Sequence, residues 1–178
     1  MNDDITGTGK HVKETLHREA QAYANGDDRP LAGYAGAVSV YAAMVGTGLL
    51  AVKLRGRRGD TSVGPWDLAL MGMTTHKVSR LLTKDPVTSP LRVFFTRYQG
   101  VSAPAELSEE VRGEGARKVV GELITCPFCT AQWIATGYAF GLALAPRLTR
   151  GAGAVFSAVA ISDWLQLAYA RLQQTQEE

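Results

Sequence analysis

The sequence predicts an all-α fold: a small helical transmembrane bundle with three to four apolar helices plus a short interfacial helix. Residues 31–52 and 123–145 contain no charged residue, and residues 151–170 contain only Asp163. As a helix, residues 123–145 would be about 35 Å long, which exceeds the hydrocarbon core of about 30 Å. Because soluble helices are seldom apolar on every face, we expect a multi-pass protein of the cell membrane.

The average composition hides this segregation of charge. A hydrophobic fraction of 46% and a mean hydropathy of −0.05 would suit a soluble protein. The alternative to the membrane interpretation is therefore a soluble bundle with Ala- and Gly-rich core helices. A net charge of +2 is too small to indicate nucleic acid, so no such partner is expected.

The chain divides into a polar tail (residues 1–30), a helical membrane domain (residues 31–172) and a second polar tail (residues 173–178). The first tail is expected to be flexible or loosely helical, and it ends in breakers at residues 25–30. The first apolar helix covers about residues 31–52. No basic segment precedes it at the very terminus, so it resembles a retained span more than a cleaved signal peptide.

The second helix, about residues 66–82, has an apolar first half and a charged second half. The charged half contains His76, Lys77 and Arg80. This amphipathic pattern suits a helix that lines a polar bundle interior or one that lies in the membrane interface. Pro86 ends it, because the residue before a proline disfavours the helical conformation.

Residues 91–98 mix aromatic rings with arginines, and Ser89-Pro90 in front of them predicts a helix start. Such residues suit the level of the lipid headgroups, although a short packed helix in an ordinary loop is equally compatible. Residues 100–115 are polar and acidic. They are expected to form a solvated loop with one short helix.

The last two apolar helices, about residues 123–145 and 151–170, are joined by a segment with Pro146 and Gly151. A tight turn there predicts an antiparallel hairpin. Small residues recur at every fourth position and predict helix-packing faces, through which the protein could also bind itself or another membrane protein. These faces contain Ala35, Ser39 and Ala43; Gly137, Gly141 and Ala145; and Ala154, Ala158 and Ser162.

Charge bias predicts the orientation. Residues 53–118 contain twelve Lys and Arg against seven Asp and Glu, and basic loops prefer the cytoplasm. We therefore expect this whole region inside, with residues 66–82 re-entrant or interfacial, the N-terminus outside and three full spans. A four-span alternative would place the basic residues at 55–58 and 112–118 on opposite sides.

Cys126-Pro127-Phe128-Cys129 is the motif most suggestive of chemistry. Its C-x-x-C spacing is one half of a common zinc arrangement and also the spacing of redox pairs. His76 and Glu122 could complete a metal site, or two chains could share one, but neither follows from spacing. We expect no bound metal and no other cofactor, with metal binding as the alternative.

Pro127 predicts a helix start with Thr125 or Cys126 as the N-cap. The field of a helix start lowers the pKa of a thiol, and Glu122 would oppose that shift. The simplest interpretation is two packed cysteines. Both are expected to be free thiols in the cell, because this helix would begin at the cytoplasmic face.

Asp163 is a carboxylate within an apolar helix. Such a group normally faces a polar partner or water, and Lys77 and Arg80 are the expected partners. Alternatively, it reaches headgroup water near the helix end. Lys77, Arg80, Arg92 and Arg97 could instead hold a lipid phosphate, although no Ser-His-Asp order, phosphate loop or paired-carboxylate motif accompanies them.

Four blocks of the sequence resemble a known family. They are residues 68–70 (Leu-Ala-Leu), 76–82 (His-Lys-Val-Ser-Arg-Leu-Leu), 85–92 (Asp-Pro-Val-Thr-Ser-Pro-Leu-Arg) and 126–129 (Cys-Pro-Phe-Cys) through Trp133. Together they are similar to bacterial membrane proteins grouped as domain-of-unknown-function family 1360, over roughly residues 65–172. Asp163 matches that family's acidic position in the last helix. The resemblance implies a membrane protein; sporulation labels on some members imply context and no mechanism.

We therefore expect an integral membrane protein that acts as an accessory or scaffold rather than as an enzyme. Membrane lipids are its expected partners. Two alternatives remain: a thiol or metal-binding membrane protein that uses Cys126 and Cys129, and an enzyme that acts on lipid headgroups.

Overall fold

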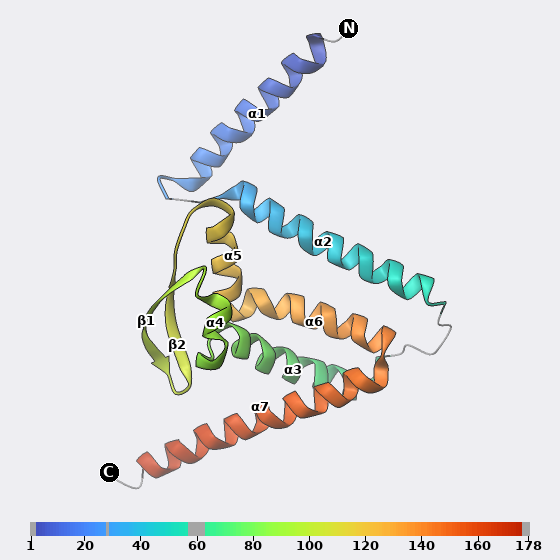
Figure 1. Cartoon of the computed structure of the whole chain (residues 1–178), viewed down its shortest axis with the longest axis vertical. Coiled ribbons are helices and arrows are strands. Elements are labelled where there is room, and N and C mark those ends of the chain that lie inside the picture. Colours follow the sequence, from blue (N-terminus) through green and yellow to red (C-terminus); the bar gives the residue numbers. More distant parts are fainter. Residues whose placement is uncertain (1–2, 28, 57–62, 176–178) are drawn as a thin grey trace.

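The computed structural model describes residues 3–27, 29–56 and 63–175, and it is mostly helical (Figure 1). In chain order its elements are α1 (Asp3–Ala24), α2 (Leu31–Leu54), α3 (Pro65–Thr83), the 3-10 turn η1 (Pro86–Thr88), α4 (Ser89–Arg92), β1 (Thr96–Ala103), β2 (Glu106–Val111), α5 (Gly115–Thr125), α6 (Pro127–Leu144) and α7 (Pro146–Gln174).

Four helices, α2, α3, α6 and α7, run between the same two ends of the molecule in alternating directions, and we call them the bundle (Figure 1). Within it, α3 packs against both α6 and α7, and α2 packs against α6. The segment from η1 to α5 lies at one end of the bundle, and we call it the head. Helix α1 projects away from the rest (Figure 1).

Proline begins three of the four bundle helices: Pro65 in α3, Pro127 in α6 and Pro146 in α7. The first helical position needs no N–H donor, and the fixed φ of proline suits it. In α3 the side chain of Asp67 also accepts a hydrogen bond from the Gly64 N–H at 3.3 Å. These prolines therefore set where each helix begins.

The head contains a β-hairpin, so the prediction of an all-α fold is wrong in this part of the chain. Strands β1 and β2 pair antiparallel from Thr96–Val111 to Ala103–Glu106, with two irregularities in register. Pro104 and Ala105 form the connection, and Ala105 takes a positive φ of 59°, as the third residue of a tight turn often does. The expected solvated loop with a short helix over residues 100–115 is therefore a hairpin.

The helices differ from the predicted ones at four places. The N-terminal tail contains α1, a helix of 22 residues. The apolar run 123–145 is not one helix, because it is interrupted at Cys126, which ends α5 and precedes α6. The turn expected between Pro146 and Gly151 is reduced to Ala145, since α7 already begins at Pro146. The expected helix over residues 91–98 is also absent, because α4 has four residues and β1 follows.

The packing face of α7 lies one residue before the predicted one. Gly153, Ser157 and Ala160 are buried, whereas Ala154, Ala158 and Ser162 are exposed. One residue rotates the position by about 100° around an α-helix. The buried residues are spaced by four and three, as one face of a helix requires, so the predicted four-residue repeat lies on the neighbouring, exposed face.

The packing face of α2 also differs from the predicted one. Ala35, Ser39 and Ala43 are exposed, and the close approaches are made by two glycines instead. A Cβ on Gly33 would lie 2.8 Å from Val119, and one on Gly48 would lie 2.4 Å from the Phe140 ring. On α6, Gly141 does meet Thr149, while a Cβ on Gly137 would meet nothing within 4 Å.

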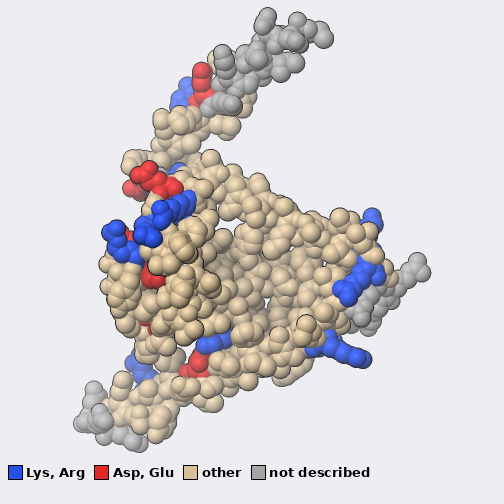
Figure 2. Space-filling view, viewed as in Figure 1, with Lys and Arg blue, Asp and Glu red and all other residues tan. Residues whose placement is uncertain are grey.

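The described surface of the bundle is apolar, and much of its interior is polar. The buried residues of α3 are Asp67, Leu70, Thr74, Ser79 and Thr83, and α2 has no buried residue. Leucine, valine and aromatic side chains along α2 and α7 are exposed instead. In Figure 2 the middle of the bundle is a band nearly free of charged residues, and charged residues gather at its two ends.

Two of the described helices are long and apolar enough to cross a membrane. They are Leu31–Leu54, with a mean hydropathy of 1.7, and Pro146–Gln174, with a mean hydropathy of 1.2. In the most apolar 18-residue segment of each helix, 0% of the first helix and 17% of the second is buried. The most apolar part of each helix is therefore largely uncovered by the rest of the described chain.

Candidate functional site

Two ion pairs join α3 to α7. At the end of the bundle away from the head, Arg150 donates two hydrogen bonds to the buried Asp67, Nε to Oδ1 at 2.7 Å and Nη2 to Oδ2 at 2.9 Å. Nearer the head, Lys77 Nζ lies 2.6 Å from Asp163 Oδ2. The two carboxylates, Asp67 in α3 and Asp163 in α7, are therefore each paired with a basic residue of the other helix.

Of the two partners expected for Asp163, the structure pairs it with Lys77. Arg80 instead forms an ion pair with Glu106 at the start of β2. His76 lies beside Trp164, with ring centroids 5.6 Å apart and planes tilted by 58°. The charged half of α3 thus contacts α7 through Lys77 and His76 and the head through Arg80.

Between the two ion pairs, α3, α6 and α7 approach closely around Gly153. Thr74 Oγ1 donates a hydrogen bond to the Gly153 carbonyl at 3.2 Å. A Cβ on Gly153 would lie 2.1 Å from the Tyr138 hydroxyl oxygen. The hydroxyls of Tyr138, Ser157 and Thr75 are buried and have no hydrogen-bond partner. Unsatisfied buried groups are costly in a water-soluble core, at about 1–3 kcal/mol each.

Arg92 organises the head. Its guanidinium is 1% exposed and forms an ion pair with Glu109, whose side chain is 7% exposed. It also donates to the Leu82 carbonyl at 2.8 Å, the Asp85 carbonyl at 3.1 Å and the Thr88 hydroxyl at 2.7 Å. Arg92 therefore satisfies carbonyls at the C-terminal end of α3 and holds β2 against it.

These contacts correct the hypothesis that Arg92 could bind a lipid phosphate. Each of its three guanidinium nitrogens donates to a group within the chain, and the side chain is only 1% exposed, so a ligand has little access to it. An open hollow of about 510 Å³ lies beside it, lined by Ser89, Pro90, Val93, Thr96, Tyr98, Leu107 and Glu109. The Glu109 carboxylate is already occupied there by Arg92 and by the Thr96 hydroxyl.

The two cysteines lie where α5 ends and α6 begins. Cys126 has an extended backbone, with φ −98° and ψ 107°, and is the N-cap of α6. Its Sγ accepts a hydrogen bond from the Cys129 N–H at 3.3 Å. Both cysteines are free thiols; Cys126 is partly exposed and Cys129 is exposed. The neighbouring Phe128 side chain is 88% exposed.

The surroundings of Cys126 favour its thiolate. Burial acts to raise its pKa, but hydrogen bonds from the Cys129 thiol and from the N–H groups of Cys129 and Phe128 outweigh burial. The positive charge of Lys84 acts in the same direction, so the pKa of Cys126 is lowered from its ordinary value. The structure therefore brings Cys126 and Cys129 together, and the charge of Lys84 acts on Cys126.

The other residues considered for a metal site are separated or engaged. Glu122 accepts a hydrogen bond from the Tyr34 hydroxyl on α2, and His76 contacts Trp164 on α7. Among the described residues, no group of three or more His, Cys, Asp or Glu could hold a metal ion. The candidate set Cys126, Cys129, His76 and Glu122 is therefore not assembled as one site.

Several contact residues were not predicted from the sequence. Tyr41 on α2 accepts a hydrogen bond from Gln132 at 2.8 Å, contacts the Thr136 hydroxyl at 2.8 Å and stacks edge-on against Trp133. Gln132 and Thr136 are polar residues four positions apart on an otherwise apolar helix, and such a pair is a sequence signal for a contact between helices. Asp67 and Arg150 both lie near a helix start, since Asp67 is the third residue of α3 and Arg150 the fifth residue of α7.

Comparison with known proteins gives a family and one curated relative. Residues 70–169 match the family described as Protein of unknown function (DUF1360). Sporulation protein YjcA of Bacillus subtilis (strain 168) is 30% identical over 71 residues, which are 38% of this chain and 60% of the relative. The chain thus spans less than two thirds of that relative's length. No solved structure matches. The family match covers more than half of the chain, including all of α4 to α6 and most of α3 and α7, and the chain therefore belongs to DUF1360.

Proposed function

We propose that this protein is an integral membrane protein whose four bundle helices cross the bilayer and whose head lies at one face. The observation that carries the proposal is the distribution of polarity. Large apolar side chains of α2 and α7 are exposed, while the interior of the bundle contains Asp67, Thr74 and Ser157. Lipid would cover the apolar surface, and water would not.

The helix lengths are compatible with this arrangement. The bundle helices α2, α3, α6 and α7 have 24, 19, 18 and 29 residues. At about 1.5 Å per residue these lengths correspond to about 27–44 Å, compared with a hydrocarbon core of about 30 Å. The shorter helices α3 and α6 lie between the longer ones and contact protein as well as lipid.

The charges of α3 are compatible with membrane depth because α7 neutralises them. An isolated charge at the centre of a span costs about 2.5–3.5 kcal/mol on insertion scales. Asp67 is paired with Arg150, and Lys77 with Asp163. We therefore assign α3 as a central helix of the bundle, replacing the predicted interfacial or re-entrant helix.

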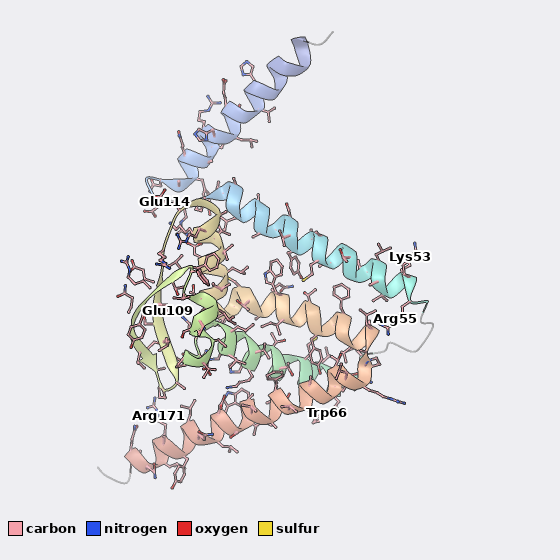
Figure 3. All side chains as sticks on the ribbon, viewed as in Figure 1. Lys53, Arg55, Trp66, Glu109, Glu114 and Arg171 are labelled. Carbon is pink, nitrogen blue, oxygen red and sulfur yellow. The ribbon has the colours of Figure 1, made fainter. Side chains whose placement is uncertain are left out.

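This assignment also replaces the predicted orientation. Figure 3 shows Lys53 and Arg55 at the end of the bundle opposite Glu109 and Glu114. The two basic regions therefore cannot lie on the same side if the helices cross a membrane. Segments at the head end carry twelve Lys and Arg, and the two connections at the other end carry six. We place the head and both termini in the cytoplasm.

Within the membrane we propose an accessory or scaffold role. Three of the four cations that a lipid-headgroup enzyme would use are engaged: Lys77, Arg80 and Arg92 form ion pairs with carboxylates of the same chain. The fourth, Arg97, is exposed on β1. The curated relative's name, a sporulation protein, supports a bacterial developmental context for such a role. The head would be the part that faces soluble partners.

A matched pair of substitutions on α2 tests the membrane assignment. Val40 lies in the middle of α2 and is 61% exposed, whereas Leu54 ends the helix and is 77% exposed. Val40→Lys should lower the membrane-inserted fraction at least about tenfold, by the cost of a central charge. Leu54→Lys should have little effect, because its ammonium group reaches headgroup water.

The measurement is fractionation of cell membranes before and after an alkaline carbonate wash. We expect the parent protein and the Leu54→Lys variant to stay in the washed membranes and to dissolve only in detergent. A parent chain that is monodisperse in buffer without detergent, with Val40→Lys unchanged, would show that α2 is not a span.

A further inference from the structure

The interruption between α5 and α6 places two thiols side by side at the start of a helix. Cys126 ends one helix and caps the next, so its backbone N–H donates to the Glu122 carbonyl and its own carbonyl accepts from Thr130. One helical turn later, Cys129 donates its N–H to Cys126 Sγ at 3.3 Å. The Cys129 thiol is also near enough to lower the pKa of Cys126. The two cysteines therefore lie within reach of each other at the start of α6.

Exposure separates this pair from packed structural cysteines. Structural free cysteines are usually buried and inert. Here Cys129 is exposed and Cys126 is partly exposed. The N-cap role alone does not explain why a cysteine occupies position 126, because serine is a better N-cap residue. The pair is also not half of a metal site within the described residues.

We propose that Cys126 and Cys129 form a thiol–disulfide exchange site whose substrate is a disulfide. Cys126 is the attacking thiolate and Cys129 is the resolving thiol. The exposed Phe128 ring between them provides an apolar contact for the incoming substrate. This site does not rest on the membrane assignment, because both cysteines lie at the junction of α5 and α6, whatever surrounds the bundle.

The exchange proceeds in two balanced steps. The Cys126 thiolate attacks one sulfur of the substrate disulfide, forming a mixed disulfide and releasing the first substrate thiolate. Cys129 then loses its proton to water and attacks Cys126 Sγ, which releases the second substrate thiolate. The two cysteines are oxidised to one disulfide by two electrons, and the substrate disulfide is reduced to two thiols. A second dithiol or thiol compound returns the pair to its reduced form.

Cys126 is the attacking residue because its surroundings stabilise negative charge on sulfur. N–H groups at the start of α6 point toward it, and the positive charge of Lys84 acts on it. The Lys84 carbonyl accepts a hydrogen bond from the Leu107 N–H at 2.9 Å, so the hairpin helps to position this residue. Thiolates in such electropositive, accessible surroundings are the reactive ones.

The test uses the full chain in dodecyl maltoside micelles, reduced and then freed of reductant. Two probes are mixed with it separately: insulin, which is a protein disulfide, and glutathione disulfide. Acid quenching, maleimide labelling and intact-mass measurement follow the sulfur species. We expect the parent chain to form an internal disulfide, Cys129→Ser to stop at a mixed disulfide on Cys126, and Cys126→Ser to react at least about tenfold more slowly.

The control is an ordinary exposed thiol, Val101→Cys, in a chain with Cys126→Ser and Cys129→Ser. Serine keeps the N-cap, and circular dichroism checks that each variant stays folded. Lys84→Met should slow the reaction of Cys126 severalfold without removing a thiol. Reaction with insulin alone identifies a protein disulfide as substrate, and reaction with glutathione disulfide alone identifies a small one. If neither probe reacts faster than with the Val101→Cys control, the exchange site does not exist.

Discussion

The head and the bundle are stabilised in different ways. In the head, the most buried side chain is Arg92, and every contact that holds it is a hydrogen bond to a charged or polar group. In the bundle, the buried positions are mostly small, such as Gly153 and Ala160, and the large apolar side chains face outward. The head should therefore be sensitive to the loss of one polar partner, and the bundle to added volume.

Removing Arg92 should have the largest effect. Arg92→Met leaves Glu109 charged, buried and without its partner, which costs about 3–5 kcal/mol for a buried pair. We expect most of the folded protein to be lost, measured as detergent-soluble monodisperse yield and as melting temperature. The control is Arg97→Met, because Arg97 is exposed on β1. Equal yields for the two variants would contradict the role given to Arg92.

Adding volume at Gly153 should have the next largest effect. A Cβ there would lie 2.1 Å from the Tyr138 hydroxyl oxygen and 3.0 Å from its ring carbon Cζ. Gly153→Ala should destabilise the bundle by about 1–3 kcal/mol through overpacking. Gly151 is the matched control, since a Cβ on it would meet nothing within 4 Å.

Thermal unfolding in detergent distinguishes these two glycine variants. Tyr138→Phe in the Gly153→Ala chain should recover part of the loss, because it removes the clashing hydroxyl. A Gly151→Ala variant that is as unstable as Gly153→Ala would show that helix entropy, and not the contact with Tyr138, is responsible.

Breaking the Lys77–Asp163 pair should have a smaller effect. Lys77 is 19% and Asp163 41% exposed at the side chain, so water or headgroups partly replace the lost partner. We expect Asp163→Asn to cost about 1 kcal/mol. Exchanging the two residues, as Lys77→Asp with Asp163→Lys, should recover part of it. A double-mutant cycle without coupling would mean that Asp163 is simply solvated.

The smallest effect is expected at Tyr41. Tyr41→Phe removes the hydroxyl contacts with Gln132 and Thr136 but keeps the edge-on contact with Trp133, whose ring centroid is 5.2 Å away. Hydrogen bonds between membrane helices average about 0.6 kcal/mol each. A small decrease in melting temperature is expected, and a decrease as large as that of Gly153→Ala would contradict this ranking.

Most of α2, α6 and α7 could be predicted because a run of about twenty residues with at most one charge is a local property of the sequence, and α3 could be predicted from its amphipathic pattern. The hairpin could not be predicted, since its acidic residues Glu106 and Glu109 read as solvated. Their partners, Arg80 and Arg92, are distant along the chain. Such pairing depends on the tertiary structure, which overrides local propensity.

The candidate site was predicted in part for similar reasons. Cys126 as the N-cap follows from Pro127, which is a local signal. The contribution of Lys84 could not be predicted, because it depends on how α3 ends beside α6. The phase of the small-residue face on α7 was ambiguous, since alanines and glycines occur on several faces of that helix.

The most direct test of the membrane arrangement is the accessibility of two single cysteines. Both native cysteines are first replaced by serine. Arg55→Cys then places a thiol at the bundle end away from the head, and Val101→Cys places one on the hairpin, where Val101 is 68% exposed. Intact cells that express each variant are treated with a membrane-impermeant maleimide, and a duplicate sample is permeabilised first.

We predict that Arg55→Cys is labelled in intact cells and that Val101→Cys is labelled only after permeabilisation. The two thiols would then lie on opposite sides of the membrane, with the head inside. Labelling of both thiols in intact cells, or of neither before permeabilisation, would place the two ends of the bundle on the same side and would contradict a bundle that crosses the membrane.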